Sequence, residues 1–496
     1  MNRRHFLHSA VAAGVASTLP VHALLAQMTE VTGEISAVSG AGAEISLEKA
    51  AVQELSDSLR GNLLLPGNAG YDVARRVLNE SIDKHPALVV QPTGVADIQN
   101  AVNFAREREL LLAVKCGGHS YGGKSTCDGG MQIDLSTFRH ARVDPTSRTA
   151  YVAGGSLLGE LDRESMAHGL VTTAGTVSHT GVGGLTLGGG FGRLAKRFGL
   201  ALDNVKGVDI VTADGRLVQA NAEQNPELFW GVRGGGGNFG IVTSFEFQLH
   251  PMQRQVIGGD IVFPLDKARD LLKLYGELLV NGPDDLSLDF IALASAGGGD
   301  PIAMIHVCYS GPANKAEQVL APLRKFGTPL QDTIAAIDYV ALQATWDNSD
   351  PRNLGEYLKG GFINELPDNL ADTLMDGFEP HPERNLTLLF QGSGGAIGRV
   401  PADATAFAHR KSIANMLPIV SWPLDQDAAP HIAYIREYWK TLQSSTDGYY
   451  TNEASDEPQR VQHANYQGNF ERLQALKNKY DPGNLFRLNA NIAPSV

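Results

Sequence analysis

The sequence predicts an α+β protein built from more than one domain, and three observations support that fold class. Residues 87–115 follow a strand–helix–strand pattern and open a strand-rich region. From about residue 256, strands alternate with longer helical segments, and residues 465–494 form an amphipathic helix with an extended end. A chain of 496 residues can bury large cores, and two or three domains are expected at that length.

The strand–helix–strand unit begins with the apolar run ALVVQP at 87–92 and ends with LLLAVK at 110–115. A helix is predicted between them because apolar residues recur at helical spacing, namely Val95, Ile98, Val102 and Ala105. The second strand leads directly into GGHSYGG at 117–123. The unit therefore places a glycine-rich stretch at the end of a strand.

Further strands extend this region to about residue 251. They are predicted at 131–136, 149–155 and 241–251, and as a hairpin over 208–220 that turns at Asp214 and Gly215. Segment 241–251 alternates apolar and polar residues, which is typical of a strand with one buried face.

The second half of the chain is predicted to form a separate α+β layer domain with its own sheet. Apolar strands at 303–310 and 386–395 alternate with helical patterns such as 267–279. The tail then ends its helix at Asp-Pro-Gly (481–483). Such a tail is expected to pack back onto an earlier part of the chain.

Composition and charge narrow the class of protein. Hydrophobic residues make up 43% and charged residues 19%, as in soluble globular proteins. The formal net charge of −13 disfavours nucleic acid or an anionic membrane surface as the main partner. Downstream of the N-terminus no uninterrupted apolar run reaches about 18 residues, so no membrane span is predicted.

The N-terminus is predicted to be an export signal. Residues 1–26 contain paired arginines, Arg3 and Arg4, then Phe6 and Leu7 and a mildly apolar run. This arrangement resembles a twin-arginine signal peptide, whose route exports folded proteins. The mature protein is therefore expected to be periplasmic or secreted.

Glycine is concentrated in loops. The chain has 55 glycines, above the usual share of about 7%, and they gather in four stretches: 116–123, 172–204, 231–243 and 392–398. Without a Cβ, backbone N–H groups can approach a phosphate or a flat ring closely. Three such loops in one strand-rich region predict a large phosphate-bearing cofactor. The strand–turn–helix setting of the dinucleotide fingerprint is not clear and a Walker-type loop is absent, which disfavours a Rossmann NAD site.

His119 lies in the first glycine loop and has two possible roles. With Cys116 and Cys127 it would hold a metal, but no second close pair supplies the remaining ligand, and no metal is predicted. Alternatively, an exposed imidazole on a rigid turn is a competent nucleophile and could attach a cofactor covalently. The three cysteines, with Cys308, do not form a disulfide framework, and pairing of Cys116 with Cys127 stays open.

The motifs carry a resemblance to a known family. PALVVQPTGVADIQNAVNFARERELLLAVKCGGHSYGG (86–123) is similar to the start of the FAD-binding domain of the vanillyl-alcohol-oxidase/p-cresol-methylhydroxylase (PCMH) superfamily, and more narrowly of the berberine bridge enzyme-like oxidases. AGTVSHTGVGGLTLGGGFGRLAKRFGLALDNV, YYTNEA and NFERLQALKNKYDPGNLFRLNANIAP match later blocks in order. The resemblance covers roughly residues 50–496.

The resemblance implies a two-part PCMH-type FAD-binding domain with an inserted α+β substrate domain. The implied boundaries are 50–255 for the FAD-binding domain, 256–448 for the substrate domain and 449–496 for a C-terminal segment that returns to the FAD domain. The implied cofactor is FAD, bound covalently through His119 at the flavin 8α-methyl. The other cofactor-binding residues implied are Lys115, Cys116, Gly117, Gly118, Ser120, Tyr121, Thr176, Gly181, Gly184, Leu185, Gly240, Ile241, Asn489 and Asn491.

One departure from the family pattern concerns the flavin linkage. Many members carry a cysteine that forms a second bond to the flavin, where this chain has Val177. Valine cannot form a thioether, so a single histidyl link is predicted. Nearby, His179 and Thr180 replace residues that are often small and apolar. The sequence therefore does not decide whether O₂ has ready access to the flavin.

Oxidation of an alcohol or amine requires a base that takes the O–H or N–H proton. The segment 447–457 resembles the family's Y-x-N-x, which implies Tyr450 as a catalytic residue. A tyrosine needs a neighbouring cation to act as a base, and Lys359 is the candidate. Packing alone is the other explanation for Tyr450. Candidate substrate contacts are Asn452 and Glu453. The alternative bases are Tyr121, Tyr449 and Glu453. His409 and Arg410 are expected to be packing or solvated residues.

The predicted function is that of an exported FAD-dependent oxidoreductase. It would oxidise a hydroxyl- or amine-bearing carbon of a small molecule by hydride transfer to flavin N5, with O₂ as the acceptor. The alternatives are a flavin dehydrogenase that passes electrons to a periplasmic carrier or quinone, and a secreted metal- or ligand-binding protein without redox turnover.

Overall fold

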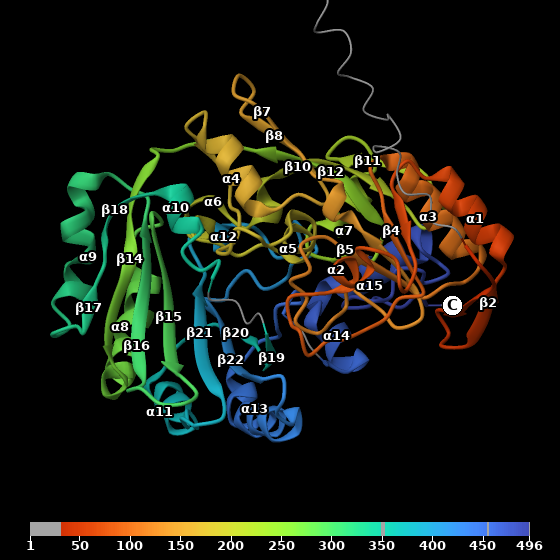
Figure 1. Ribbon diagram of the computed structural model, residues 1–496. Coiled ribbons are helices and arrows are strands. Elements are labelled where there is room, and N and C mark those ends of the chain that lie inside the picture. The colour runs from red at the N-terminus through yellow and green to blue at the C-terminus, as the bar shows by residue number, and fades with distance from the viewer. Residues whose placement is uncertain (1–30, 349–352, 454–455, 496) are drawn as a thin grey trace, which may run out of the picture.

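The computed structural model describes residues 31–348, 353–453 and 456–495 (Figure 1). The export signal predicted at 1–26 lies outside these residues. In Figure 1 a large sheet with its helices lies beside a second half that holds two smaller sheets. The predicted α+β class is confirmed. No helix in the described ranges is both long and apolar enough to cross a membrane.

The first small sheet contains the predicted strand–helix–strand unit. Its strand order is β3-β4-β6-β5, in which β4 and β5 both pair in parallel with β6 and β3 is antiparallel. The elements are β3 (Asn62–Leu64), β4 (Leu88–Gln91), α3 (Val95–Glu107), β5 (Leu112–Lys115) and β6 (Met131–Asp134). Strand β5 lies at the edge of the sheet, so the glycine-rich loop that follows it is free to contact other parts of the molecule.

The second small sheet is antiparallel, in the order β11-β10-β12-β8-β7. Its strands are β7 (Ala141–Asp144), β8 (Thr149–Ala153), β10 (Val205–Val211), β11 (Leu217–Asn221) and β12 (Ile241–Gln248). The predicted hairpin is the pair β10 and β11, and Gly215 in its turn has φ +77°, a conformation that favours glycine. Along β12 buried and half-buried residues alternate, as the sequence pattern predicts.

Shorter elements complete this half of the molecule. They are β1 (Ile35–Val38), β2 (Glu44–Leu47), α1 (Lys49–Ser58), α2 (Tyr71–Arg75), α4 (Leu158–Met166), β9 (Leu170–Val171), α5 (Val182–Gly188), α6 (Ala195–Phe198), α7 (Pro226–Val232) and β13 (His250–Pro251). The hairpin of β1 and β2 was not predicted, because its eight residues bury little apolar surface.

The large sheet follows the order β17-β14-β16-β15-β21-β22-β19. In addition, β18 pairs with β14 and β20 pairs with β22. Its strands are β14 (Gln255–Pro264), β15 (Leu286–Ala294), β16 (Ile302–Tyr309), β17 (Gln331–Asp332), β18 (Ala335–Asp338), β19 (Leu354–Leu358), β20 (Gly361–Ile363), β21 (Asn385–Gly392) and β22 (Ala414–Pro423). The helices of this half are α8 (Ala268–Asn281), α9 (Ala316–Arg324), α10 (Tyr339–Gln343), α11 (Asp368–Asp376), α12 (Ala396–Arg399) and α13 (Ala428–Leu442).

Strand alternation gives the large sheet two different faces. Phe290, Leu388 and Phe390 belong to the core formed with α8, α11 and α13. Because successive side chains point to opposite faces, Gln391 lies on the other side of the sheet, where Asn415 Nδ2 donates to Gln391 Oε1 at 2.9 Å. This second face therefore carries polar groups.

The C-terminal segment returns to the first half. It contains α14 (Gln459–Asn465) and α15 (Phe470–Tyr480), drawn in blue beside red and orange elements in Figure 1. Leu473, Leu476 and Ile492 are buried in the same core as Phe239 and Phe245. The return of the tail follows from the apolar face of α15, as the sequence predicts.

Candidate active site

A cavity of about 330 Å³ lies where the glycine loops, the C-terminal segment and the polar face of the large sheet meet. Its volume is within the range of about 300–1,000 Å³ that is typical of small-molecule sites. Most of the predicted site residues line it: Cys116, Gly117, Gly118, His119, Ser120, Tyr121, Thr176, Gly181, Gly184, Leu185, Gly240, Ile241, Tyr450 and Asn489. Lys115, Lys359 and Asn491 are not among its lining residues.

Two glycines allow the first two loops to touch. A Cβ at Gly117 would lie 2.4 Å from the backbone nitrogen of Gly181, and a Cβ at Gly181 would lie 2.4 Å from Cys116 Sγ. Any larger residue would push the loops apart. These two glycines therefore bring the loop after β5 against the start of α5, which closes one wall of the cavity.

Other glycines leave the cavity open. A Cβ at Gly184 would meet no atom within 4 Å, and one at Gly237 would reach only Asn489 Nδ2, at 4.0 Å. Both residues line the cavity. Asn489 also lines the cavity, and its Oδ1 is buried without a hydrogen-bond partner in the described part of the chain. Bare backbone and an unsatisfied amide oxygen are what a flat, polar cofactor would use.

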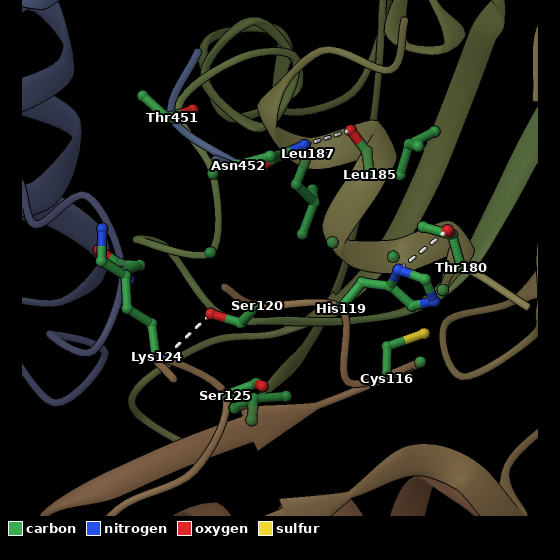
Figure 2. A pocket seen from close by; sticks show the side chains of 18 of the residues that line it. Cys116, His119, Ser120, Lys124, Ser125, Thr180, Leu185, Leu187, Thr451 and Asn452 are labelled. Atoms are coloured by element: carbon green, nitrogen blue, oxygen red, sulfur yellow. Dashed lines mark hydrogen bonds between the residues drawn. The ribbon is translucent and has the colours of Figure 1, made fainter. Parts of the chain in front are cut away.

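His119 forms a pair with His179. Their Nε2 and Nδ1 atoms are 2.7 Å apart, and the ring centroids are 4.8 Å apart. On the other side of the His119 ring, Nδ1 lies 3.4 Å from Thr180 Oγ1 (Figure 2). His179 Nε2 is in turn 3.2 Å from the carbonyl oxygen of Asp347. The His119 ring is thus held by hydrogen bonds at both nitrogens in the wall of the cavity.

The backbone at Thr176 is fixed by a buried arginine. Arg193 Nη1 donates to the Thr176 carbonyl oxygen at 2.7 Å, and Arg193 Nε donates to His306 Nε2 at 2.9 Å. His306 Nδ1 lies 2.7 Å from Asp260 Oδ1. Arg193 follows α5, whereas His306 and Asp260 lie on β16 and β14, so this chain of hydrogen bonds joins the large sheet to the second glycine loop.

The cysteines form no bridge in the described structure. All three carry free thiols, and burial raises the pKa of Cys116 to about 11. Pairing of Cys116 with Cys127 is therefore not what the structure shows. Among the described residues no group of three or more His, Cys, Asp and Glu side chains is placed to hold a metal ion.

Tyr450 is buried and accepts two hydrogen bonds. The backbone N–H of Gly190 and Asn452 Nδ2 both donate to its hydroxyl oxygen, at 2.8 Å each. Asn452 Nδ2 also donates to the Leu185 carbonyl at 3.0 Å (Figure 2). Burial raises the pKa of Tyr450 well above its usual range. These contacts fasten the segment at 450–452 to the second glycine loop.

Lys359, predicted to be the cation beside Tyr450, is paired with two carboxylates in the structure. Lys359 Nζ is paired at 2.6 Å with Asp456 Oδ1 and at 2.6 Å with Glu457 Oε1. These two carboxylates occupy its ammonium group, and among the described residues no cation is one of the main influences on the pKa of Tyr450. The sequence could not reveal this pairing, because 97 and 98 residues separate Lys359 from its partners.

Glu453 has the properties expected of a base. It lines the cavity, and its Oε2 accepts a hydrogen bond from Asn415 Nδ2 at 2.7 Å. Burial raises its pKa to about 7. A carboxyl group with a pKa near neutrality can exchange a proton at physiological pH. The alternative base Tyr449 is buried, and burial raises its pKa well above the usual range.

The two other predicted cofactor residues, Lys115 and Asn491, do not line the cavity. Lys115 is buried, donates to the carbonyl of Ala74 and lies 3.5 Å from Asp134. Asn491 has its backbone oxygen bound by Gln459 Nε2 at 2.7 Å. Arg410, expected to be a packing or solvated residue, forms a buried two-point pair with Asp203 at 2.8 and 2.9 Å.

Several cavity residues were not predicted, and two of them have polar side chains that lack a partner among the described residues. Lys124 and Ser125 follow the first glycine loop and line the cavity, and their polar side-chain atoms are buried without a hydrogen-bond partner among the described residues. The prediction of cofactor-binding residues rested on the glycine-rich loop, which ends at Gly123, directly before these two residues. A signal was nevertheless present, because a lysine directly after a cofactor loop adds a charge next to the predicted site.

Comparisons with known proteins agree with this geometry. A family model for an FAD binding domain matches residues 86–221, and a model described as berberine and berberine like matches residues 449–493. An FAD-linked oxidoreductase of Dictyostelium discoideum is 34% identical over 89% of this chain and 97% of its own length. (R)-6-hydroxynicotine oxidase of Paenarthrobacter nicotinovorans is 28% identical over 88% of this chain and 97% of that enzyme.

A solved structure extends the likeness to three dimensions. The crystal structure of 6-hydroxy-D-nicotine oxidase from Arthrobacter nicotinovorans superimposes with a TM-score of 0.80 at 27% identity, and covers 88% of this chain and 99% of that chain. Fold, cavity and comparisons together define an FAD-linked oxidoreductase. The chain belongs to the berberine and berberine-like family.

Proposed function

We propose that this chain is an exported oxidoreductase whose FAD is linked to one residue, His119, and which oxidises a hydroxyl- or amine-bearing carbon of a small molecule with O₂ as the acceptor. The observation that carries the proposal is the placement of His119 in the cavity wall, with both ring nitrogens held by neighbouring side chains. The relative that oxidises (R)-6-hydroxynicotine supports the choice of a small-molecule substrate and an oxidase reaction.

The glycine loops and the tail are suited to hold the cofactor. Gly184, Gly237 and Asn489 Oδ1 offer bare backbone and an unsatisfied acceptor to it. His119 would provide the covalent attachment, and Val177 leaves no second linkage. Bound FAD supplies an acceptor for the hydride that leaves the substrate carbon.

Glu453 is the residue we assign to proton removal. Its carboxylate would accept the proton of the substrate O–H or N–H while hydride leaves the adjacent carbon. Asn415 Nδ2, at 2.7 Å, orients the carboxylate. Tyr450 holds the cavity wall, and no cation is among the main influences on its pKa in the described part of the chain.

The linkage is tested with the full-length protein. Acid-precipitated protein is resolved on a denaturing gel and viewed for flavin fluorescence, with His119→Ala as the variant and the exposed His168→Ala as the control. We expect fluorescence on the wild-type and control bands and none on His119→Ala. Mass spectrometry of the 113–127 peptide then identifies the linked residue. A wild-type band without fluorescence contradicts the covalent linkage.

The acceptor and the export route need separate measurements. Reduced protein mixed with air-saturated buffer is expected to regain its yellow absorbance within seconds, whereas return only with a quinone or carrier protein would indicate a dehydrogenase. Export is tested by replacing Arg3 and Arg4 with lysine in the full-length precursor. The variant is expected to stay inside the cell, and unchanged export would contradict the twin-arginine route.

A further inference from the structure

The wall of the cavity beside the first glycine loop carries a buried cation that the proposed chemistry does not use. Lys124 lines the cavity, and its Nζ has no hydrogen-bond partner among the described residues. Ser125, the next residue, also lines the cavity and has a buried Oγ that lacks a partner in the same part of the chain. In Figure 2, Ser120 lies between Lys124 and His119.

A buried ammonium group without a partner is rare, because the protein has removed its water and supplied no acceptor in return. Here two adjacent residues, Lys124 and Ser125, leave polar atoms in that state in one wall of one cavity. A bound ligand that provides the missing acceptors would offset the cost of burying these polar groups.

The nearby carboxylates do not satisfy Lys124. Asp456 and Glu457 are close enough to influence its pKa. However, Lys359 Nζ is bonded to both of them at 2.6 Å, and Arg436 Nη2 is bonded to Asp456 Oδ2 at 2.6 Å. Asp456 and Glu457, which do not line the cavity, are therefore bonded to two other cations, Lys359 and Arg436, and Lys124 Nζ has no bonded acceptor among the described residues. One positive charge, that of Lys124, remains for a ligand.

We propose that Lys124 is a specificity-determining residue that binds an oxyanion, such as a carboxylate or phenolate, on the substrate. The proposal deepens the proposed function and rests on it, since the oxyanion would be held while Glu453 acts elsewhere in the same cavity. An ammonium–carboxylate hydrogen bond is among the stronger ones in proteins, and here it is shielded from water. The substrate class is thus a small alcohol or amine that also carries an acidic oxygen.

The direct test compares two probes of the same shape, benzoate and benzamide. Binding of each is measured by isothermal titration calorimetry to the purified wild-type protein, to Lys124→Met, to Lys124→Arg and to the exposed control Lys411→Met. We expect wild type and control to bind benzoate at least ~10-fold more tightly than benzamide. Lys124→Met should lose ~10–100-fold of benzoate affinity and leave benzamide binding unchanged, and Lys124→Arg should keep part of the preference.

The preference of the wild type for benzoate over benzamide should also depend on pH. Burial lowers the pKa of Lys124 to about 8, with the charges of Glu457, Asp456 and Lys359 as smaller influences. The ammonium group is charged below that value, so benzoate affinity of the wild type is expected to fall as the pH rises through about 8. Lys124→Met should show no such fall.

Several results would overturn the proposal. Equal affinity of the wild type for both probes, no binding of either probe, or an unchanged preference in Lys124→Met would each exclude an oxyanion site at Lys124. Loss of flavin absorbance in Lys124→Met and Lys124→Arg, with folding intact by circular dichroism, would assign the residue to the cofactor instead. A wild-type preparation that never holds flavin would contradict the proposed function, while the calorimetric comparison of the probes would still decide the role of Lys124.

Discussion

His119 Nε2 and His179 Nδ1 lie 2.7 Å apart, so that the histidine proposed to carry the flavin shares a proton with a second histidine. The carbonyl of Asp347, 3.2 Å from His179 Nε2, fixes the tautomer of His179 by accepting its N–H. His179 Nδ1 is then the acceptor, and it can take a proton from His119. The pair therefore supplies the base that makes His119 a better nucleophile.

His179→Ala is expected to slow covalent attachment of the flavin by about 10²-fold, the lower end of what a positioned base contributes. The readout is the fraction of flavin that stays with the protein after acid precipitation, followed over time after FAD is added to protein produced under riboflavin limitation. Non-covalent flavin binding should persist. His168→Ala, on an exposed residue, is the matched control, and full attachment in His179→Ala at the wild-type rate would exclude a role as base.

Glu453→Gln is expected to lower kcat/KM by about 10²–10⁴-fold, because glutamine keeps the hydrogen bond from Asn415 but cannot take a proton. The sign of the pH dependence follows from the raised pKa. Burial raises it to about 7, so the wild-type carboxyl is protonated and inactive below that value, and activity should rise as the pH passes through it. The variant should lose this limb of the profile. Glu365→Gln, an exposed change, serves as the control.

Tyr450→Phe tests whether the tyrosine is structural. The change leaves the Gly190 N–H without its acceptor and removes one acceptor of Asn452 Nδ2. We expect the free energy of unfolding to fall by about 1–3 kcal/mol, the usual cost of a buried polar group left unsatisfied. Thermal unfolding followed by circular dichroism measures this, with Tyr151→Phe as control. A wild-type melting temperature together with a 10³-fold loss of kcat would instead assign the hydroxyl to catalysis.

Regular patterns in the sequence were enough to predict the architecture. The apolar spacing of α3 and the alternation of β12 follow from simple packing rules, and both elements lie within a few residues of the predicted bounds. The hairpin of β1 and β2 was not predicted. Strands are predicted from a local pattern of apolar residues, and this hairpin contains few apolar residues.

The candidate site could be predicted only in part. Some of its residues are marked by their neighbours in the sequence, whereas the role of others depends on residues that are distant in the sequence. His119 stands in a glycine loop that marks it in the sequence. Lys359 and Lys124, in contrast, look alike as isolated lysines, and only the fold shows that Lys359 is neutralised by Asp456 and Glu457 whereas Lys124 is not. Burial, which raises the pKa of Glu453, is likewise a property of the tertiary structure.

Lys477→Met tests how the C-terminal segment is held against the cavity. The fully buried Lys477 Nζ donates to Asp481 Oδ2 at 2.6 Å, to the Asn238 carbonyl at 2.9 Å and to the Phe486 carbonyl at 3.0 Å. Its loss leaves Asp481 as a buried charge without its cation, and breaking such a pair costs about 3–5 kcal/mol. Urea unfolding should show this loss, whereas the exposed Lys479→Met should stay within about 0.5 kcal/mol of wild type.

The same change should reach the cofactor. Phe486 and Asn489 line the cavity, and Asn489 Nδ2 donates to the Phe486 carbonyl at 3.0 Å. Because Lys477 and Asn489 bind the same carbonyl, Lys477→Met is expected to release this part of the tail and to expose the flavin. Flavin fluorescence quenched by iodide measures that exposure: stronger quenching than in Lys479→Met supports a tail that closes the cavity, and identical quenching in the two variants would show that the tail is held by the apolar face of α15 alone.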